Sequence, residues 1–324
     1  MYAGTLLALG KVNGLHKRVG IAAGLLRTLW MREAKLSSEV ENIHTTAEEL
    51  VLAGAGRTLE VRDSSLESWN YVRALEYGIG SNLPWSVRVI REMHEILMQS
   101  VRGKDFRPGQ FRDRGVYLSG PKVGAKHARF IPMPPGNELL DAAHSLEKFV
   151  NQPHAQIPPQ FVVALTHYQF EAIPPFSDGN GRIGRVLISR SLVKEGLLEE
   201  HPVVYMSAYI NHHKRMYADL LQRISHEGGQ AWSDWIGFFL DAIRTQALDA
   251  IWRSEALVDL QARFASRLQE DGAPPRLRAV VDKLFARPAL NVADLVEQTG
   301  TTPATATSGA LIVGRNKRSA VPAW

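Results

Sequence analysis

One loop constrains the fold more than any other stretch, because it lies between two apolar runs. Residues 161–165 read Phe-Val-Val-Ala-Leu, and residues 185–193 read Arg-Val-Leu-Ile-Ser-Arg-Ser-Leu-Val. A Gly-Asn-Gly turn at 179–181 separates them, and glycines allow the chain to turn tightly there. We therefore predict two buried helices, at 160–172 and 182–195, which hold this loop between them.

The loop carries the chemistry of a phosphate site. The first amides of a helix have no partners within the helix, and its dipole favours anions. Asp178 can hold a divalent metal, since magnesium takes carboxylate and phosphate oxygens. Arg182 and Arg185 are three apart, and each can fork onto a phosphate. Taken alone, the short motif is more typical of a glycine-rich helix start with surface arginines.

Composition sets the outer bounds of function. At 45% hydrophobic and 22% charged residues, the chain has the composition of an ordinary globular protein. The absence of cysteine excludes disulfides, zinc–thiolate sites and thiol nucleophiles. A net charge of +5 is compatible with phosphate ligands or nucleic acid. No apolar run approaches the ~18 residues of a membrane span, and no basic stretch precedes the N-terminal apolar patch. We expect a cytoplasmic protein without a membrane segment.

Helical patterns dominate the rest of the chain. The N-terminal region gives a helix near 25–35, which the glycines at 10, 14, 20 and 24 interrupt on the N-terminal side, and Ser37 or Ser38 could cap a short helix. Further helices are predicted at 46–54, 65–77, 85–101, 138–151, 207–226 and 232–268. Residues 102–136 predict a β-hairpin. After a linker at 272–275, short helices at 276–286, at 292–299 and from Thr302 suggest a helix-turn-helix.

The whole loop resembles the signature of the Fic family, His-Pro-Phe-x-Asp-Gly-Asn-Gly-Arg-x-x-Arg. The matching residues are Pro175, Phe176, Asp178, Gly179, Asn180, Gly181, Arg182 and Arg185. Gly109–Arg112 and Ala128–Pro132 look like the family's approach to its flap. The resemblance implies a mostly α fold with one hairpin flap. It divides the chain into an N-terminal helical region (1–100), a Fic core (101–245), a helix and linker (246–275) and a truncated winged-helix-like remnant (276–324).

The resemblance also implies transfer of AMP from ATP to a protein Ser, Thr or Tyr hydroxyl, with Mg²⁺. In that case Asp178 ligates the metal and residues 179–181 bind the α- and β-phosphates. Arg182 and Arg185 hold the β- and γ-phosphates, Phe176 packs beneath the loop and Tyr217 borders the nucleotide. The hairpin near 119–126 aligns a segment of the protein substrate by strand addition. A homo-oligomer is left open.

A second motif, at 36–42, looks like the inhibitory motif of the family, Ser/Thr-x-x-x-Glu-Gly/Asn. Ser37, Glu41 and Asn42 fit it. The resemblance implies that Glu41 pairs with Arg185 and so withholds the arginine that the γ-phosphate needs. A solvated acidic helix start is the alternative interpretation of so short a pattern.

Position 174 departs from the family. The resemblance makes a histidine there the base that takes the proton from the target hydroxyl, and Pro174 has no titratable group. A general base contributes roughly 10²–10⁴ in rate. We expect Glu171 on a different side of its helix, His167 as a packed histidine, and Ile173 away from helical angles because a proline follows it.

The leading hypothesis is therefore a Fic-type AMP transferase that Glu41 restrains and Pro174 impairs. The alternative is a nucleotide-binding protein without catalysis, or a regulator whose C-terminal helix-turn-helix binds DNA or a protein partner. Only slight positive charge supports DNA binding, from Arg276, Arg278, Lys317 and Arg318.

Overall fold

The protein is mostly helical, as predicted. The computed structural model describes residues 1–19, 23–81, 83–99, 107–116, 118–119, 128–130, 132–199, 202–286, 293, 296, 300 and 302. In chain order its helices are α1 (Tyr2–Val19), α2 (Ala23–Val40), α3 (Ala47–Gly54), the 3-10 turn η1 (Thr58–Glu60), α4 (Asp63–Gly80), α5 (Val87–Leu97), α6 (Asn137–Asn151), α7 (Pro159–Ala172), α8 (Asn180–Lys194), α9 (Ser207–His212), α10 (Lys214–Glu227), α11 (Gly229–Glu270) and α12 (Pro275–Ala286).

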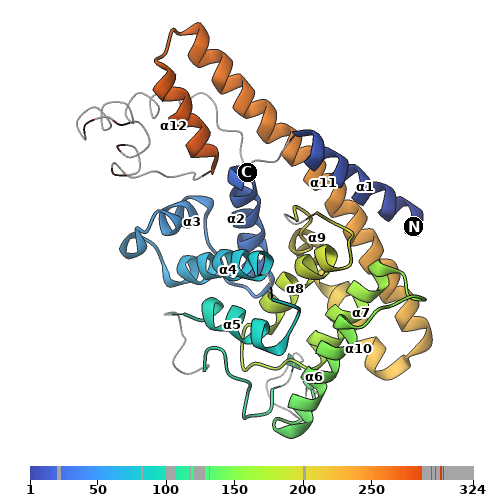
Figure 1. Cartoon of the computed structure of the whole chain (residues 1–324). Helices are drawn as coiled ribbons and strands as arrows, with labels where there is room; N and C mark the ends of the chain where they lie inside the picture. The colour runs from blue at the N-terminus through green and yellow to red at the C-terminus, as the bar shows by residue number, and fades with distance from the viewer. Residues whose placement is uncertain are drawn as a thin grey trace.

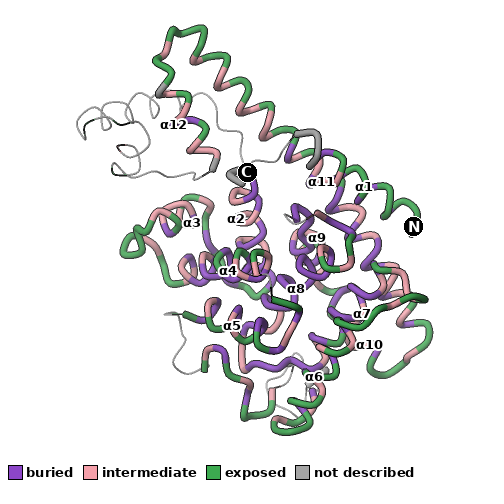
Figure 2. Tube along the Cα trace, in the orientation of Figure 1, coloured by how far each residue is buried: buried purple, intermediate pink, exposed green. Residues whose placement is uncertain are grey.

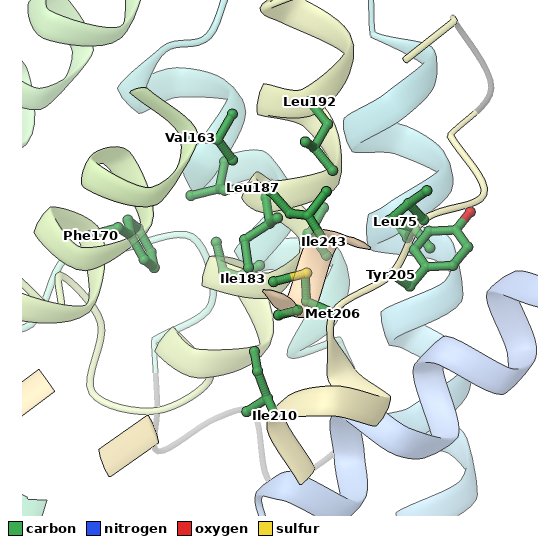
Figure 3. Close-up of a cluster of buried hydrophobic side chains, with 14 of the residues drawn as sticks. Leu75, Val163, Phe170, Ile183, Leu187, Leu192, Tyr205, Met206, Ile210 and Ile243 are labelled. Atoms are coloured by element: carbon green, nitrogen blue, oxygen red, sulfur yellow. The ribbon is translucent and has the colours of Figure 1, made fainter. Parts of the chain in front are cut away.

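Helix α8 lies at the centre of the fold. It packs against α7, α4, α2 and α5 (Figure 1), and every residue from 182 to 192 is buried (Figure 2). Figure 3 shows its Ile183 and Leu187 among side chains of α4, α7 and α11. Burial on all sides fixes the N-terminus of α8, and therefore the glycine turn before it.

Helix α11 forms one edge of the molecule. It runs for 42 residues without a break, so the domain boundary expected between residues 245 and 246 falls inside a helix. Its first half buries Trp235, Phe239 and Ile243, and α1 packs along it (Figure 1). After a turn at 271–274, α12 folds back and packs against both α11 and α2.

The expected interruption by N-terminal glycines is wrong for the described residues. Gly10 and Gly14 lie inside α1, where a glycine costs about 1 kcal/mol relative to alanine. The buried face of α1, which includes Leu9, Val12 and Leu15, offsets that cost. Gly24 lies inside α2, and Gly20 lies outside the described residues.

The region around residues 36–43 is not a separate helix. Ser37 and Ser38 lie in the last turns of α2 instead of capping a new helix. The chain then turns at Asn42, whose φ of 59° is left-handed, a conformation that asparagine tolerates better than most residues. The next helix, α3, begins behind Thr46, which forms a capping box with Glu49.

Two short strands are present in the hairpin region. Strands β1 (Leu118–Ser119) and β2 (Ala128–Phe130) pair antiparallel, while residues 120–127, where the flap is expected, lie outside the described residues. The helices predicted at 292–299 and from Thr302 fall on a segment of which the structure describes four single positions. No helix in the described part of the chain combines the length and apolarity needed to cross a membrane.

Candidate functional site

A cavity of about 430 Å³ opens at the N-terminus of α8. The glycine loop and Arg185 form its floor, and its walls come from the end of α2, from α7 and from α10. All of residues 177–181 line it, together with Pro174. The structure therefore assembles the sequence-predicted loop around a space within the usual 300–1,000 Å³ range of small-molecule sites.

The loop is held by its own side chains. Gly179 takes a left-handed φ of 79°, which glycine adopts at no steric cost. The Asn180 side chain bridges back to Phe176, accepting from its N–H at 2.9 Å and donating to its carbonyl at 2.7 Å. The first helical bond of α8 joins Ile183 N–H to Gly179 O. The amides of residues 180–182 precede it and have no acceptor within the helix.

Phe176 and His94 support the loop from below. The buried Phe176 ring stacks on His94 with centroids 3.7 Å apart. His94 Nδ1 accepts from Gly109 N–H at 3.0 Å, so its Nε2–H donates to Asp178 O at 3.1 Å. Burial lowers the pKa of His94 to about 4, and the ring stays neutral in this bridging tautomer. His94 was not singled out from the sequence, because one histidine in an amphipathic helix carries no distinctive pattern.

Arg112 holds the two prolines in place. It is buried, and its guanidinium donates to the carbonyls of Pro174 at 2.8 Å and Met133 at 2.6 Å. Its own N–H donates to Pro175 O at 2.9 Å. The motif Gly109–Arg112 therefore has a structural task at the loop, where Arg112 fixes the backbone at position 174.

Arg185 meets the end of α2 in the cavity. Its Nε donates to Ser37 Oγ at 2.7 Å, and its Nη2 donates to Ser37 O and to Glu41 Oε1, both at 2.9 Å. Burial raises the pKa of Glu41, but the charge and hydrogen bond of Arg185, with Arg182 and Lys214, outweigh burial and lower it. The structure thus brings Ser37, Glu41 and Arg185 together, with Glu41 ionised at neutral pH.

Gly181 gives Glu41 its place over the loop. A Cβ at position 181 would lie 2.4 Å from Glu41 Oε1, a distance that contact between side chains does not allow. The third residue of the expected inhibitory motif, Asn42, accepts from Lys214 Nζ at 3.2 Å. Lys214 lines the cavity from α10 and was not singled out from the sequence.

Arg182 does not face the cavity, which corrects the prediction that both guanidiniums reach phosphate. It is 1% exposed and forms a buried ion pair with Glu67 of α4. Its Nη2 lies 3.7 Å from Asp178 Oδ1. Only the backbone amide of Arg182 remains in the position of an anion donor, while its side chain anchors α8 to α4.

Tyr217 forms part of the cavity wall, and the buried His167 lies behind it. Tyr217 lines the cavity, and its hydroxyl lies 2.8 Å from His167 Nε2. Burial, followed by the charge of Arg185, lowers the pKa of His167 to about 3. His167 is therefore a neutral, packed histidine.

The end of α7 differs from the sequence prediction. Ile173 keeps helical angles, φ −80° and ψ −28°, and its N–H donates to Gln169 O at 3.0 Å. Its buried side chain and the Arg112 contacts to the following carbonyls offset the clash that a proline imposes. Because the helical geometry continues, Glu171 lines the same cavity as Pro174. The expectation that Glu171 lies on a different side is wrong.

The site offers one protein ligand for magnesium, the carboxylate of Asp178. Asp178 is 36% exposed at the cavity, and the described residues contain no group of three His, Cys, Asp or Glu side chains that could hold a metal. A single carboxylate is nevertheless what magnesium uses when phosphates and waters complete its shell. The residues present fit a metal that arrives with a nucleotide.

Comparisons with known proteins agree with this geometry. Residues 84–192 match the profile described as Fic/DOC family, and residues 5–80 match the profile described as Fic/DOC family N-terminal. The chain is 27% identical over 190 residues to Protein adenylyltransferase Fic of Aedes aegypti, covering 58% of this chain and 34% of that protein. The chain thus spans about a third of the length of this curated relative.

Solved structures show the same fold. A Fic family protein from Desulfovibrio desulfuricans G20 superposes with a TM-score of 0.62 at 20% identity, over 94% of this chain and 86% of that one. A Fic domain containing signaling protein from Bacteroides thetaiotaomicron VPI-5482 gives a TM-score of 0.59 at 19% identity, over 77% of this chain and 97% of that one. At these identities the likeness establishes the fold alone.

Proposed function

The chain belongs to the Fic/DOC family, and we propose that it transfers AMP from ATP to a protein hydroxyl, restrained by Glu41 and slowed by Pro174. The observation that carries this proposal is the arrangement of one arginine, one acid and one glycine turn in a single cavity. Arg185 reaches the cavity floor beside the free amides of α8, and Glu41 occupies it from α2.

ATP and magnesium have a consistent set of partners in this site. The amides of residues 180–182 and the Arg185 guanidinium would bind phosphate oxygens. Asp178 would hold Mg²⁺, which neutralises phosphate charge when bound. Phe176 supports the loop from beneath, and Tyr217 lies on the wall where the rest of the nucleotide would extend.

Glu41 competes directly with a phosphate. Its carboxylate uses the Arg185 Nη2 donor and lies against Gly181. A phosphate placed at the same donor would meet a like charge at contact distance, which raises its free energy of binding. Glu41 therefore has to move before Arg185 can hold a nucleotide, which is the basis for proposing autoinhibition.

Pro174 lowers the rate without removing the nucleotide partners. Its ring offers no proton acceptor, and its carbonyl is already bound by Arg112. The loss of a base costs roughly 10²–10⁴ in rate. A protein target would approach along the paired strands β1 and β2, where an extended segment can add its own backbone hydrogen bonds.

Binding and transfer need separate measurements. Calorimetry with ATP and Mg²⁺ on the wild type, Glu41→Gly and Arg185→Ala tests the site: Glu41→Gly should bind more tightly than wild type, and Arg185→Ala should bind weakly. ATP labelled on its α-phosphate then tests transfer, with self-labelling as the readout. Glu41→Gly combined with Pro174→His should label at least about 100-fold faster than Glu41→Gly alone.

Two outcomes would contradict the proposal. Equal labelling by the single and double variants would mean that position 174 does not limit the rate. Tight ATP binding with no labelling by either variant would instead support a nucleotide-binding protein without transferase activity. Salt-sensitive binding of duplex DNA by the full chain would support the regulator alternative.

A further inference from the structure

One polar group in the cavity has no assigned task. Glu171 Oε1 is fully buried and has no hydrogen-bond partner, although the residue lines the cavity from the last turn of α7. A buried carboxylate oxygen without a partner costs stability. Such groups are few in native proteins and call for an explanation.

The neighbouring helix leaves room for this carboxyl. A Cβ at Gly184 would lie 2.1 Å from Glu171 Oε1 and 3.3 Å from His167 Cε1. Any other residue at 184 would displace Glu171, since both elements are packed in the core. Gly184 therefore leaves space beside α8 for the carboxyl of Glu171, within one helical turn of Arg185.

Glu171 also lies next to the position that lacks its histidine. Residues three apart on a helix are neighbours, with Cβ atoms about 5–6 Å apart. Helical angles persist through Ile173, so Glu171 and Pro174 meet this condition, and both line the cavity. An acid at 171 can therefore reach the space that the side chain of a base at 174 would occupy.

The groups around Glu171 bring the pKa of its carboxyl close to neutral pH. Burial raises the pKa of Glu171, the charge of Arg185 opposes the rise and the charge of Glu41 adds to it, so that the pKa lies at about 7. A base works best when its pKa lies near the working pH. The charged or titratable groups that line the cavity or contact Glu171 are Arg185 on α8, Glu41 at the end of α2, His167 and Tyr168 on α7, Tyr217 and Lys214 on α10, and Asp178 in the loop.

We propose that Glu171 is the general base of this chain, accepting the proton of the target hydroxyl in place of the missing histidine. The inference depends on the proposed AMP transfer. The hydroxyl oxygen forms its bond to the α-phosphorus while the bond from that phosphorus to the pyrophosphate oxygen breaks. The hydroxyl proton passes to the Glu171 carboxylate, pyrophosphate departs, and the carboxyl then returns the proton to solvent.

The test uses the full chain in the Glu41→Gly background, where Arg185 is released. Self-labelling with α-labelled ATP and Mg²⁺ is compared for Glu41→Gly, for Glu41→Gly/Glu171→Gln, and for each of these with Pro174→His. Glu171→Gln should slow labelling at least about 10-fold when position 174 is proline. With histidine at 174 the same change should slow labelling less than about 3-fold, because the histidine supplies the base.

Two further readouts separate a base from a merely structural residue. The labelling rate of Glu41→Gly should rise between pH 6 and 8, and this rise should disappear in Glu41→Gly/Glu171→Gln. Carbon-13 NMR of the glutamate carboxyls should show two resonances that titrate near neutrality, one from Glu33 and one that is absent from Glu171→Gln. Calorimetry should give the same ATP affinity, within about 2-fold, for the Gln and Glu forms, which also verifies folding.

The outcomes distinguish this inference from the function on which it depends. Unchanged labelling after Glu171→Gln in the proline background overturns the inference, as does a silent Glu41→Gly beside an active Glu41→Gly/Pro174→His. In both cases the proposed AMP transfer stands. If no variant labels although all bind ATP, the transferase proposal fails and the assignment of Glu171 as its base fails with it.

Discussion

The two arginines of α8 lie three residues apart in one buried helix, yet their partners differ in exposure. Arg182 pairs with Glu67, whose side chain is 2% exposed, and Arg185 pairs with Glu41, whose side chain is 39% exposed. Both guanidiniums are almost fully buried. The exposure of the acid therefore decides which pair is permanent and which one a ligand can open.

This comparison predicts its largest effect at Glu67. Removing one partner of a buried ion pair leaves an uncompensated charge, at a cost of about 3–5 kcal/mol. We expect Glu67→Gln to lower the free energy of unfolding by that amount, as measured by denaturant titration. Glu41→Gln is the matched control, and it should cost about 1 kcal/mol or less because water reaches Glu41 and Ser37 still binds Arg185. Equal costs would refute the distinction between the two pairs.

The next effect concerns Glu33, a buried acid on α2. Glu33 is buried, its Oε1 accepts from the hydroxyls of Tyr71 and Ser207, and burial raises its pKa from 4.5 to about 7. Between these two values the folded state holds a proton that the unfolded state has lost. Stability from this group is therefore complete below pH 4.5 and is lost as pH rises through 7.

Urea titrations at pH 5 and pH 8 measure this contribution. The wild type should lose up to about 3 kcal/mol more than Glu33→Gln across that interval. Glu171 titrates in the same window in both proteins, so its contribution cancels. A difference of the opposite sign would mean that Glu33 is ionised in the folded state, like Glu41.

A smaller effect sharpens the account of the Glu41–Arg185 pair. We expect Glu41→Gln to tighten ATP binding by about 10-fold, since couplings between competing groups are typically 1–3 kcal/mol. AMP lacks the phosphates that would reach Arg185, so its affinity should change less than about 2-fold. Calorimetry with both nucleotides tests this, and an equal gain for ATP and AMP would place the competition elsewhere than at Arg185.

The smallest effect is expected at Lys214. This half-buried lysine donates to Asn42 Oδ1 and lies near Glu41. Lys214→Met should change the free energy of unfolding by less than about 0.5 kcal/mol, as is usual for exposed charge contacts. A loss above 1 kcal/mol would show that Lys214 belongs with the permanent pairs.

Sequence patterns predicted the helices around the site closely, because α7 and α8 are long apolar segments with a glycine turn between them. The resemblance also implied that Glu41 pairs with Arg185, whereas the contacts of Ser37 with Arg185 were not foreseen. Sequence patterns failed for Arg182, because residues three apart on a helix point about 60° apart, and only packing decides which one meets a cavity. They failed for Glu171 because the proline rule for Ile173 is a preference that buried contacts override.

The N-terminal helix also departs from its sequence prediction, because tertiary packing outweighs local helix propensity there. Gly10 and Gly14 lower the intrinsic helix stability of α1, and the burial of one face of α1 against α11 outweighs that loss. His94 and Arg112 act on backbone groups of the loop. Nothing in a single sequence marks which carbonyls a distant side chain will reach.

The packing of α12 against α2 has a geometric consequence for the site. Helix α2 has 18 residues, which makes it a rod about 27 Å long. Tilting such a rod by about 5° about one end swings the other through about 2 Å. That displacement is enough to part a hydrogen bond of 2.9 Å between Arg185 and Glu41. A tilt of α2 of this size would therefore be enough to open or close the cavity floor.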